Sequence, residues 1–327
     1  MATTINPLGG HDYLRLSVTD RCNLRCAYCM PADGVPLLPR EEILTFEEIE
    51  RLVRILSEAG VSRVKVTGGE PLVRRGIARL VETIAAIAGV EDLSMTTNGL
   101  LLARHARSLR RARLGRVNVS LDTLSAEKFR HVTRGGRIER VLEGIDAALM
   151  EGLRPVKVNV VLVEGFNEDE ITPFLRFAAE KGVSMKFIEE MPTENNMPYR
   201  TFKAGPARLV MEQMRSLGAV EPLEKEWPGP ARYYRVSGLS QPVGIVSAIS
   251  APFCADCSRL RLTATGQFRP CLYSNYSVDL RSALRGKDSD EEILRLVAGA
   301  LLNVDKGGSV LEKMARRTTP TMSQVGG

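Results

Sequence analysis

The sequence has 327 residues, of which 44% are apolar and 26% charged, and its net charge is +6. A chain of this length can bury a core without disulfide bonds, and it corresponds to roughly two domains or one large α/β barrel. No run of about 18 apolar residues is present, which excludes a membrane-spanning helix. The start lacks the basic and apolar segments of a secretory signal, so we expect a cytoplasmic protein with no membrane partner.

Arginine makes up 35 of the 45 basic residues. Its guanidinium fork binds phosphates and carboxylates, and an excess of it also suits nucleic acid. One tryptophan and 5% aromatic residues leave few surfaces on which bases could stack, so we expect no nucleic-acid partner. Only His11, His105 and His131 are present, which excludes a histidine-rich metal site.

Apolar, β-branched segments alternate with amphipathic ones through the first 190 residues or so. The pattern predicts strands at 14–19, 63–67, 93–97, 116–121, 156–163 and 185–189. It predicts helices at 47–59, 74–88, 101–111, 140–151 and 168–181. Nearly continuous apolar strands alternating with helices indicate a parallel sheet covered by helices. Six such units form a partial (β/α) barrel or a doubly wound sheet, with the functional site at the C-terminal strand ends.

Polar and glycine-rich residues recur at these predicted strand ends. A cysteine-containing loop follows the first strand, Thr-Gly-Gly-Glu-Pro (67–71) ends the second, and Thr-Thr-Asn-Gly (96–99) ends the third. Ser-Leu-Asp (120–122) ends the fourth strand, and Glu-Glu-Met-Pro (189–192) ends the sixth. This recurrence indicates a site rather than chance.

The pattern changes after about residue 192. A helix is predicted at 206–217, and strands at 232–236, 243–247 and 260–265 are predicted to be antiparallel around a second group of cysteines. We therefore divide the chain into a barrel domain at 5–235 and a C-terminal region at 236–327.

The six cysteines form two tight groups, Cys22, Cys26, Cys29 and Cys254, Cys257, Cys271. Clustered thiols in a long chain without a secretory signal indicate metal ligation rather than disulfides. A structural zinc site needs four ligands, and an iron–sulfur cluster is usually held by four cysteines. A group of only three cysteine ligands therefore implies a metal with an open position. Two zinc sites, each completed by a residue distant in sequence, are the alternative.

The C-x3-C-x2-C loop, with Tyr28 before its third cysteine, and the Gly-Gly-Glu-Pro segment at 68–71 resemble the signatures of the radical S-adenosylmethionine (SAM) superfamily. The match extends to the GTP 3′,8-cyclase family of molybdenum-cofactor biosynthesis. It includes 14–23, 67–71, 96–99, 118–122, 156–159, 253–261 and the final Gly-Gly, in the same order and with nearly unchanged spacing.

The resemblance implies a partial (β/α)6 barrel with a small C-terminal region that carries a second cluster. It also implies the reaction, in which a 5′-deoxyadenosyl radical formed from SAM removes the ribose 3′ hydrogen of GTP, giving 3′,8-cyclo-7,8-dihydro-GTP. The implied cofactors are two [4Fe–4S] clusters and SAM. The implied partners are an external electron donor and the cyclic pyranopterin monophosphate synthase that takes the product, and the chain would be a monomer or homodimer.

The resemblance also assigns residues, by number in this sequence. The first cluster would be held by Cys22, Cys26 and Cys29, and the second by Cys254, Cys257 and Cys271. SAM would be bound by Tyr28, Gly69, Glu70, Ser120 and Met191, and GTP by Arg15, Lys65, Thr96, Lys157, Arg259, Leu260 and Arg261. Arg15, Gly326 and Gly327 would act in catalysis, with the double glycine reaching the cavity.

Two positions depart from the family, whose members commonly carry arginine where this chain has Lys65 and Lys186. A lysine supplies a point charge without the bidentate fork of arginine, so Lys65 is kept as a phosphate contact and Lys186 is left unassigned. Rival functions are a peptide-modifying radical SAM maturase and a non-catalytic iron–sulfur protein that binds RNA. Reductive SAM cleavage with GTP present would separate the three.

Overall fold

The computed structural model describes residues 7–191, 205–224, 229–274 and 276–303, which fold around one twelve-stranded sheet. Six strands pair in chain order, and each runs parallel to the next. They are β1 (Tyr13–Ser17), β2 (Arg63–Thr67), β3 (Asp92–Thr97), β4 (Arg116–Ser120), β5 (Lys157–Leu162) and β6 (Ser184–Glu189).

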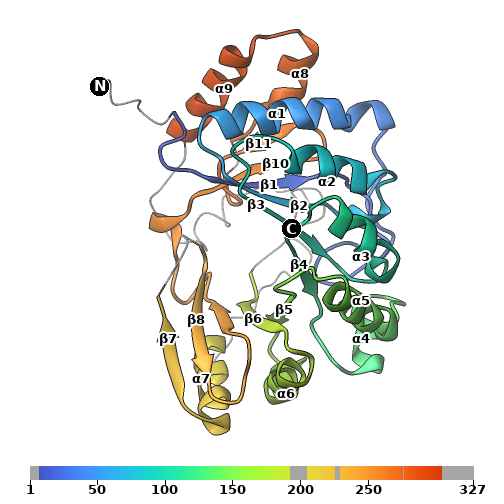
Figure 1. The fold of residues 1–327 in the computed structure, drawn as a ribbon, viewed down its shortest axis with the longest axis vertical. Coiled ribbons are helices and arrows are strands. Elements are labelled where there is room, and N and C mark those ends of the chain that lie inside the picture. The colour runs from blue at the N-terminus through green and yellow to red at the C-terminus, as the bar shows by residue number, and fades with distance from the viewer. Residues whose placement is uncertain (1–6, 192–204, 225–228, 275, 304–327) are drawn as a thin grey trace.

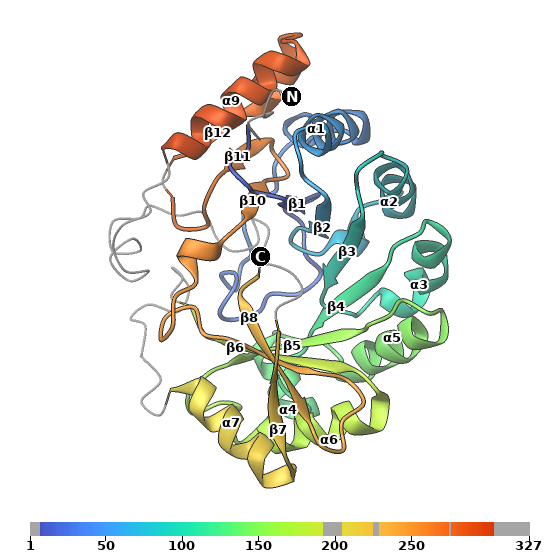
Figure 2. The ribbon, with the colours of Figure 1, turned by 60° about the vertical axis from the view of Figure 1, so that its left-hand side comes forward.

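Helices lie between these strands along the chain and cover the convex side of the curved sheet (Figures 1 and 2). They are α1 (Phe46–Glu58), α2 (Ile77–Ala85), α3 (Leu102–Arg111), α4 (Ala126–Val132), α5 (Ile138–Met150) and α6 (Ile171–Lys181). The expected partial (β/α)6 barrel is confirmed, and each of its six strands lies within a residue or two of its predicted range.

Sequence signals explain where several helices begin and end. Thr45 and Glu48 form a reciprocal capping box at the start of α1, each side chain accepting a hydrogen bond from the other's backbone N–H. Gly182, with φ of +66°, ends α6 in the left-handed conformation that glycine adopts without strain.

The rest of the chain extends both edges of this sheet. After α7 (Pro206–Leu217) come β7 (Val220–Leu223), β8 (Ala231–Val236), β9 (Val243–Val246), β10 (Arg259–Leu262), β11 (Gln267–Arg269), β12 (Val278–Asp279), α8 (Leu280–Arg285) and α9 (Asp290–Leu302). Strand β9 joins the edge at β6 and β10 joins the edge at β1, both in parallel.

The prediction of antiparallel strands around the second cysteine group is therefore correct only in part. Antiparallel pairing joins β7 to β8, β8 to β9, β10 to β11 and β11 to β12. The parallel pairing of β9 and β10 with the barrel was not expected, because local sequence does not encode which distant edge a strand will join. The predicted boundary at 235/236 falls near the end of β8, and the division into 5–235 and 236–327 stays a prediction.

The two faces of the barrel strands differ in character. Leu14, Leu16, Val64 and Val66 are fully buried on the face that packs against the helices. Since successive strand residues point to opposite faces, the residues between them form an inner face. That face is polar, and many of its residues are only half-buried, which leaves an accessible interior. Among the described residues, no helix is long and apolar enough to cross a membrane.

Candidate active site

Strand register gathers most of the predicted substrate residues on the inner face. Arg15 lies beside Lys65 on one side and Arg261 on the other. Continuing strand by strand, the same face carries Lys65, Ser94, Thr96, Arg116, Asn118, Ser120, Lys157, Asn159 and Lys186, with Arg259 on β10. Leu260 is different, because it pairs with Leu14 on the opposite face and is fully buried. Any contact of Leu260 with substrate would therefore come from its backbone.

The inner face carries more positive charge than its own residues neutralise. Burial, and then the neighbouring Arg15, lower the pKa of Lys65 well below its usual value. Burial also lowers the pKa of Lys186 to about 8 and that of Arg261 well below its usual range. In the described part of the chain, no carboxylate forms an ion pair with any of these three residues. A buried cluster of cations that repel one another is stabilised by an anion with several negative charges.

Buried polar atoms without protein partners also line this face. Within the described residues, Ser94 Oγ, Asn118 Oδ1, Asn159 Oδ1 and Arg261 Nη1 have no hydrogen-bond partner. Buried polar groups are usually satisfied by protein, water or ligand. These atoms therefore mark the interior as a place for a polar ligand.

The first cysteine loop lies after β1 and is held by main-chain hydrogen bonds. Arg25 N donates to Thr133 O at 3.3 Å and Ala27 N donates to Val132 O at 2.9 Å, which ties the loop to the end of α4. Arg134 adds a clamp, because its Nη1 donates to Arg25 O and Met30 O at 3.0 and 2.9 Å. Arg134 was not predicted as a site residue.

The three thiols of this loop lie close enough to influence one another. Burial, then the thiolates of Cys29 and Cys22 together with Asp122, raise the pKa of Cys26. Bound iron would offset this repulsion, because its positive charge stabilises the deprotonated thiols that coordinate it. Among the described residues, no three His, Cys, Asp or Glu side chains are placed to hold a single metal ion. A four-iron cluster is a larger body, and the loop's donor set fits it.

Asn98, at the end of β3, contacts the same loop. Its Nδ2 donates to Asn23 Oδ1 at 2.8 Å and lies 3.8 Å from Cys22 Sγ. Hydrogen bonds to cysteine sulfurs tune the potential of a bound cluster. Asn98 was not predicted as a site residue, although it belongs to the Thr-Thr-Asn-Gly segment at a strand end.

The Gly-Gly-Glu segment joins the end of β2 to the cysteine loop. A Cβ on Gly69 would lie 2.4 Å from Arg21 O, so this position excludes any side chain. Glu70 is buried, and its carboxylate accepts hydrogen bonds from Asn98 N at 2.6 Å, Thr97 Oγ1 at 2.7 Å and Leu72 N at 3.0 Å. Burial outweighs these bonds and raises the pKa of Glu70 to about 7. The contacts predicted for Gly69 and Glu70 with SAM stay predictions.

The second cysteine group lies before and after β10 and β11. Arg259 Nε donates to Cys257 Sγ at 3.3 Å, and its guanidinium carbon lies 4.9 Å from the centre of the Phe253 ring. Burial alone would raise the pKa of Cys257, but Arg259 lowers it. Arg261 is also close to the thiols of Cys271 and Cys257. The two arginines therefore favour thiolates here.

The end of β6 reaches this second group. Tyr273 N donates to Cys271 Sγ at 3.4 Å, while its hydroxyl donates to Met191 Sδ at 3.0 Å. Met191, predicted to contact SAM, is thus linked to the second cysteine group. Gly326 and Gly327 lie outside the described residues.

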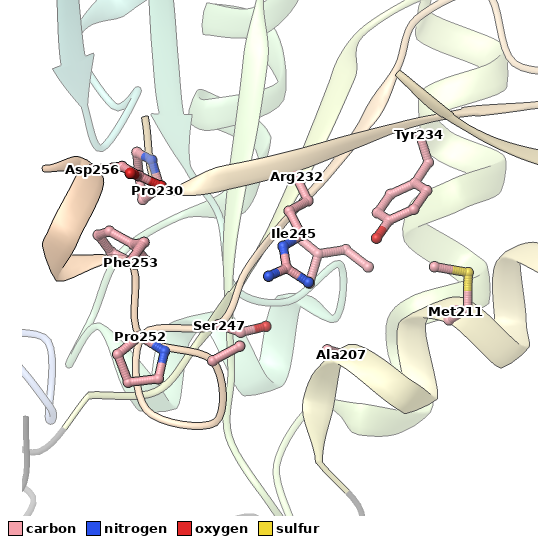
Figure 3. Close-up of a pocket in the computed structure, with 11 residues that line it drawn as sticks. Ala207, Met211, Pro230, Arg232, Tyr234, Ile245, Ser247, Pro252, Phe253 and Asp256 are labelled. Atoms are coloured by element: carbon pink, nitrogen blue, oxygen red, sulfur yellow. The ribbon is translucent and has the colours of Figure 1, made fainter. Parts of the chain in front are cut away.

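A separate pocket of about 150 Å³ lies on the other face of β8 and β9 (Figure 3). Its lining includes Met211 of α7, Tyr234 of β8 and Phe253 beside the second cysteine group. Because Tyr234 and Ile245 alternate with the residues of the inner face, this pocket is distinct from the barrel interior.

Comparison with known proteins gives two matching families. Residues 16–178 match the Radical SAM superfamily, and residues 183–309 match Molybdenum Cofactor Synthesis C. GTP 3′,8-cyclase of Heliobacterium modesticaldum is 46% identical over 322 residues, covering 96% of this chain and 97% of that protein. GTP 3′,8-cyclase of Pelotomaculum thermopropionicum is 44% identical over 318 residues, covering 97% of each.

Among solved structures, the S-adenosylmethionine-bound form of Streptococcus suis SuiB aligns with a TM-score of 0.64. The alignment covers 93% of this chain and 71% of SuiB at 15% identity, so it supports the fold alone.

The partial barrel with a three-cysteine loop after its first strand defines a radical SAM protein. That class implies one [4Fe–4S] cluster and SAM as cofactors. Within the class, the chain belongs to the GTP 3′,8-cyclase family.

Proposed function

We propose that this chain is a GTP 3′,8-cyclase that converts GTP to 3′,8-cyclo-7,8-dihydro-GTP, the first step of molybdenum-cofactor biosynthesis. The observation that carries the proposal is the cationic inner face of the barrel, where Arg15, Lys65 and Arg261 lie side by side on neighbouring strands. A triphosphate supplies the several negative charges that this face lacks. The close relatives of the chain are GTP 3′,8-cyclases.

Cys22, Cys26 and Cys29 would hold the first [4Fe–4S] cluster, and Tyr28, Gly69, Glu70, Ser120 and Met191 would bind SAM. When bound, these cofactors supply a carbon-centred radical that removes the ribose 3′ hydrogen. The protein's own task is to bind and orient GTP and to exclude side reactions. Arg15, Lys65, Thr96, Lys157, Arg259 and Arg261 would hold GTP on the inner face, with Leu260 contributing through its backbone.

A second [4Fe–4S] cluster held by Cys254, Cys257 and Cys271 is part of this proposal. Support comes from Arg259 and Arg261, which lie beside the thiols and on the same inner face as Arg15. A cluster there would face the substrate from the C-terminal region of the chain. Iron and sulfide analysis of anaerobically reconstituted protein should approach about eight of each per chain, since each cluster contains four. A colourless preparation with stoichiometric zinc would refute it.

The remaining partners and the tail are also proposals. An external donor would supply the electron, and the product would pass to cyclic pyranopterin monophosphate synthase in the cytoplasm. The chain would act as a monomer or homodimer. Gly326 and Gly327 would reach the cavity, where their terminal carboxylate could meet Arg15. Deleting both glycines should leave iron content and SAM cleavage measurable and remove most cyclised product.

The decisive experiment supplies reconstituted protein, without oxygen, with SAM, dithionite and each nucleoside triphosphate in turn. The cyclised product, identified by mass spectrometry, should form with GTP and not with ATP, CTP or UTP. SAM cleavage without any cyclised nucleotide would contradict the proposed reaction.

A further inference from the structure

Tyr233 reaches the inner face from a strand outside the six-stranded barrel. It lies on β8 and pairs with Gly244 of β9, which in turn pairs with Lys186 of β6. Paired residues of neighbouring strands share a face, so Tyr233 lies on the side of the sheet that carries Lys186. A Cβ on Gly244 would lie 2.9 Å from Tyr233 Cε1, so the missing side chain makes room for the ring.

The hydroxyl of Tyr233 meets lysines from two barrel strands. Lys157 Nζ lies 3.3 Å from the hydroxyl oxygen and 5.0 Å from the centre of the ring. Lys186 also interacts with the hydroxyl. Burial alone would raise the pKa of Tyr233, but Lys186 and Lys157 together lower it.

Among the described residues, the proton of the Tyr233 hydroxyl has no acceptor. A lysine ammonium only donates, so the phenol oxygen accepts from the lysines and its own O–H remains available. In the described part of the chain, no carboxylate pairs with Lys157 or Lys186. Two ammonium groups and one hydroxyl therefore converge on a place where an acceptor with negative charge would complete the hydrogen bonds.

We propose that Tyr233 determines specificity for the polyphosphate of the substrate. Its hydroxyl donates to a phosphate oxygen and holds Lys157 and Lys186 toward the same anion. This assignment rests on the proposed function, because GTP is the nucleotide expected inside the barrel. It adds to the phosphate site a residue from the C-terminal strands, with Gly244 as the position that admits it.

The test is Tyr233→Phe, which keeps the ring over Gly244 and removes only the hydroxyl. A hydrogen bond to a charged group is worth about 1.5–3 kcal/mol, which corresponds to a loss of roughly tenfold or more in affinity. By calorimetry on reconstituted protein, the Kd for GTP should rise by about tenfold, while the Kd for guanosine should not change. In turnover, KM for GTP should rise much more than kcat falls. Tyr234→Phe, on the opposite face, is the matched control and should bind GTP as the wild type does.

A second variant tests the position of the ring rather than the presence of the hydroxyl. Gly244→Ala keeps the hydroxyl but displaces the ring, and it should give the same selective loss of GTP affinity. Unchanged GTP binding in Tyr233→Phe, or an equal loss for GTP and guanosine, would overturn the proposal. Its failure is distinct from failure of the proposed function. Wild-type protein that cyclises GTP while Tyr233→Phe binds it normally refutes only the role of Tyr233.

Discussion

The phenol of Tyr28 donates a hydrogen bond to the carboxylate of Asp122, which joins the first cysteine loop to the end of β4. The other carboxylate oxygen of Asp122 accepts from Val161 N at 2.8 Å, which extends the link to β5. Burial raises the pKa of Asp122 to about 6, against the effect of both bonds. Asp122 is therefore a buried carboxylate that depends on Tyr28 for one of its partners.

We expect Tyr28→Phe to weaken this link without removing the ring. A buried acceptor that loses its donor costs about 1–3 kcal/mol, so the free energy of unfolding should fall by that amount. Denaturant unfolding of metal-free protein at pH 8, where Asp122 is ionised, measures it. Tyr276→Phe is the control, since Tyr276 is 41% exposed and should change nothing. Equal stability of Tyr28→Phe and wild type would show that the bond contributes little.

The raised pKa of Glu70 should make the free energy of unfolding depend on pH. Its pKa is raised by burial from 4.5 to about 7 in the folded protein. A carboxyl that binds its proton more tightly when folded adds stability below the unfolded pKa, and this is lost as pH rises through the folded pKa. Metal-free protein should therefore lose up to about 3 kcal/mol between about pH 4.5 and 7 through this group.

In Glu70→Gln this part of the pH dependence should disappear, because an amide does not ionise. Chemical unfolding across the pH series measures the slope, and exposed Glu41→Gln should retain the wild-type slope. A variant at position 70 with an unchanged slope would mean that Glu70 ionises normally.

The lowered pKa of Lys186 should make the affinity for GTP depend on pH. Burial lowers its pKa to about 8, so free protein loses this positive charge as pH rises from 7 to 9. A bound polyphosphate favours the protonated form, so binding takes up a proton, and affinity should fall toward tenfold per pH unit above about pH 8. Calorimetry in buffers of different ionisation enthalpy measures the proton uptake directly.

Lys186→Arg should bind GTP with a weaker dependence on pH over this range, since arginine keeps its proton and only groups such as Lys65, whose pKa is also lowered, still titrate. Lys181→Arg is the matched control, because Lys181 pairs with Asp146 on α5, away from the inner face. A wild-type affinity that stays constant from pH 7 to 9 would be incompatible with this role of Lys186.

The two cysteine groups should fail in different ways. Cys26→Ser should abolish SAM cleavage, because the electron path to SAM runs through the first cluster. Cys257→Ser should remove cyclisation but leave some uncoupled SAM cleavage, because under the proposed function it removes only the second cluster, which would anchor the substrate. Chromatographic assay of 5′-deoxyadenosine and cyclised nucleotide separates the two, and equal loss of cleavage in both variants would contradict this division.

Sequence periodicity located the barrel closely. The predicted strand at 63–67 coincides with β2, and the predicted helix at 206–217 coincides with α7. The resemblance assigned Arg15, Lys65, Lys157, Arg259 and Arg261 to the substrate, and strand register then places them on one face. The pattern missed α9, although this helix has thirteen residues and begins with a capping box of Ser289 and Glu292. It also missed α4, α8 and the strands β7, β11 and β12, each of seven residues or fewer. Such segments are too short to establish a period.

Other parts of the site depend on contacts that no local pattern specifies. Tyr233 lies in a strand whose sequence, Ala-Arg-Tyr-Tyr-Arg-Val, gives no functional signal. Its meeting with Lys157 follows from the parallel pairing of β6 with β9, which joins distant segments. Asp122 and Asn98 carried a signal, because both follow strand ends within segments already singled out by their polarity.

The pairing of β10 with β1 has a consequence for how the protein is made. Strand β1 emerges from the ribosome early, but the neighbour that covers its outer edge is synthesised near the end of the chain. Until then β1 presents unpaired backbone groups, which is the kind of exposed edge that recruits strands from other chains. Contacts between distant segments also form slowly. Nascent chains should therefore be most prone to aggregate between completion of the first strands and release of β10, and chaperones that hold them in this interval should raise the yield of folded protein.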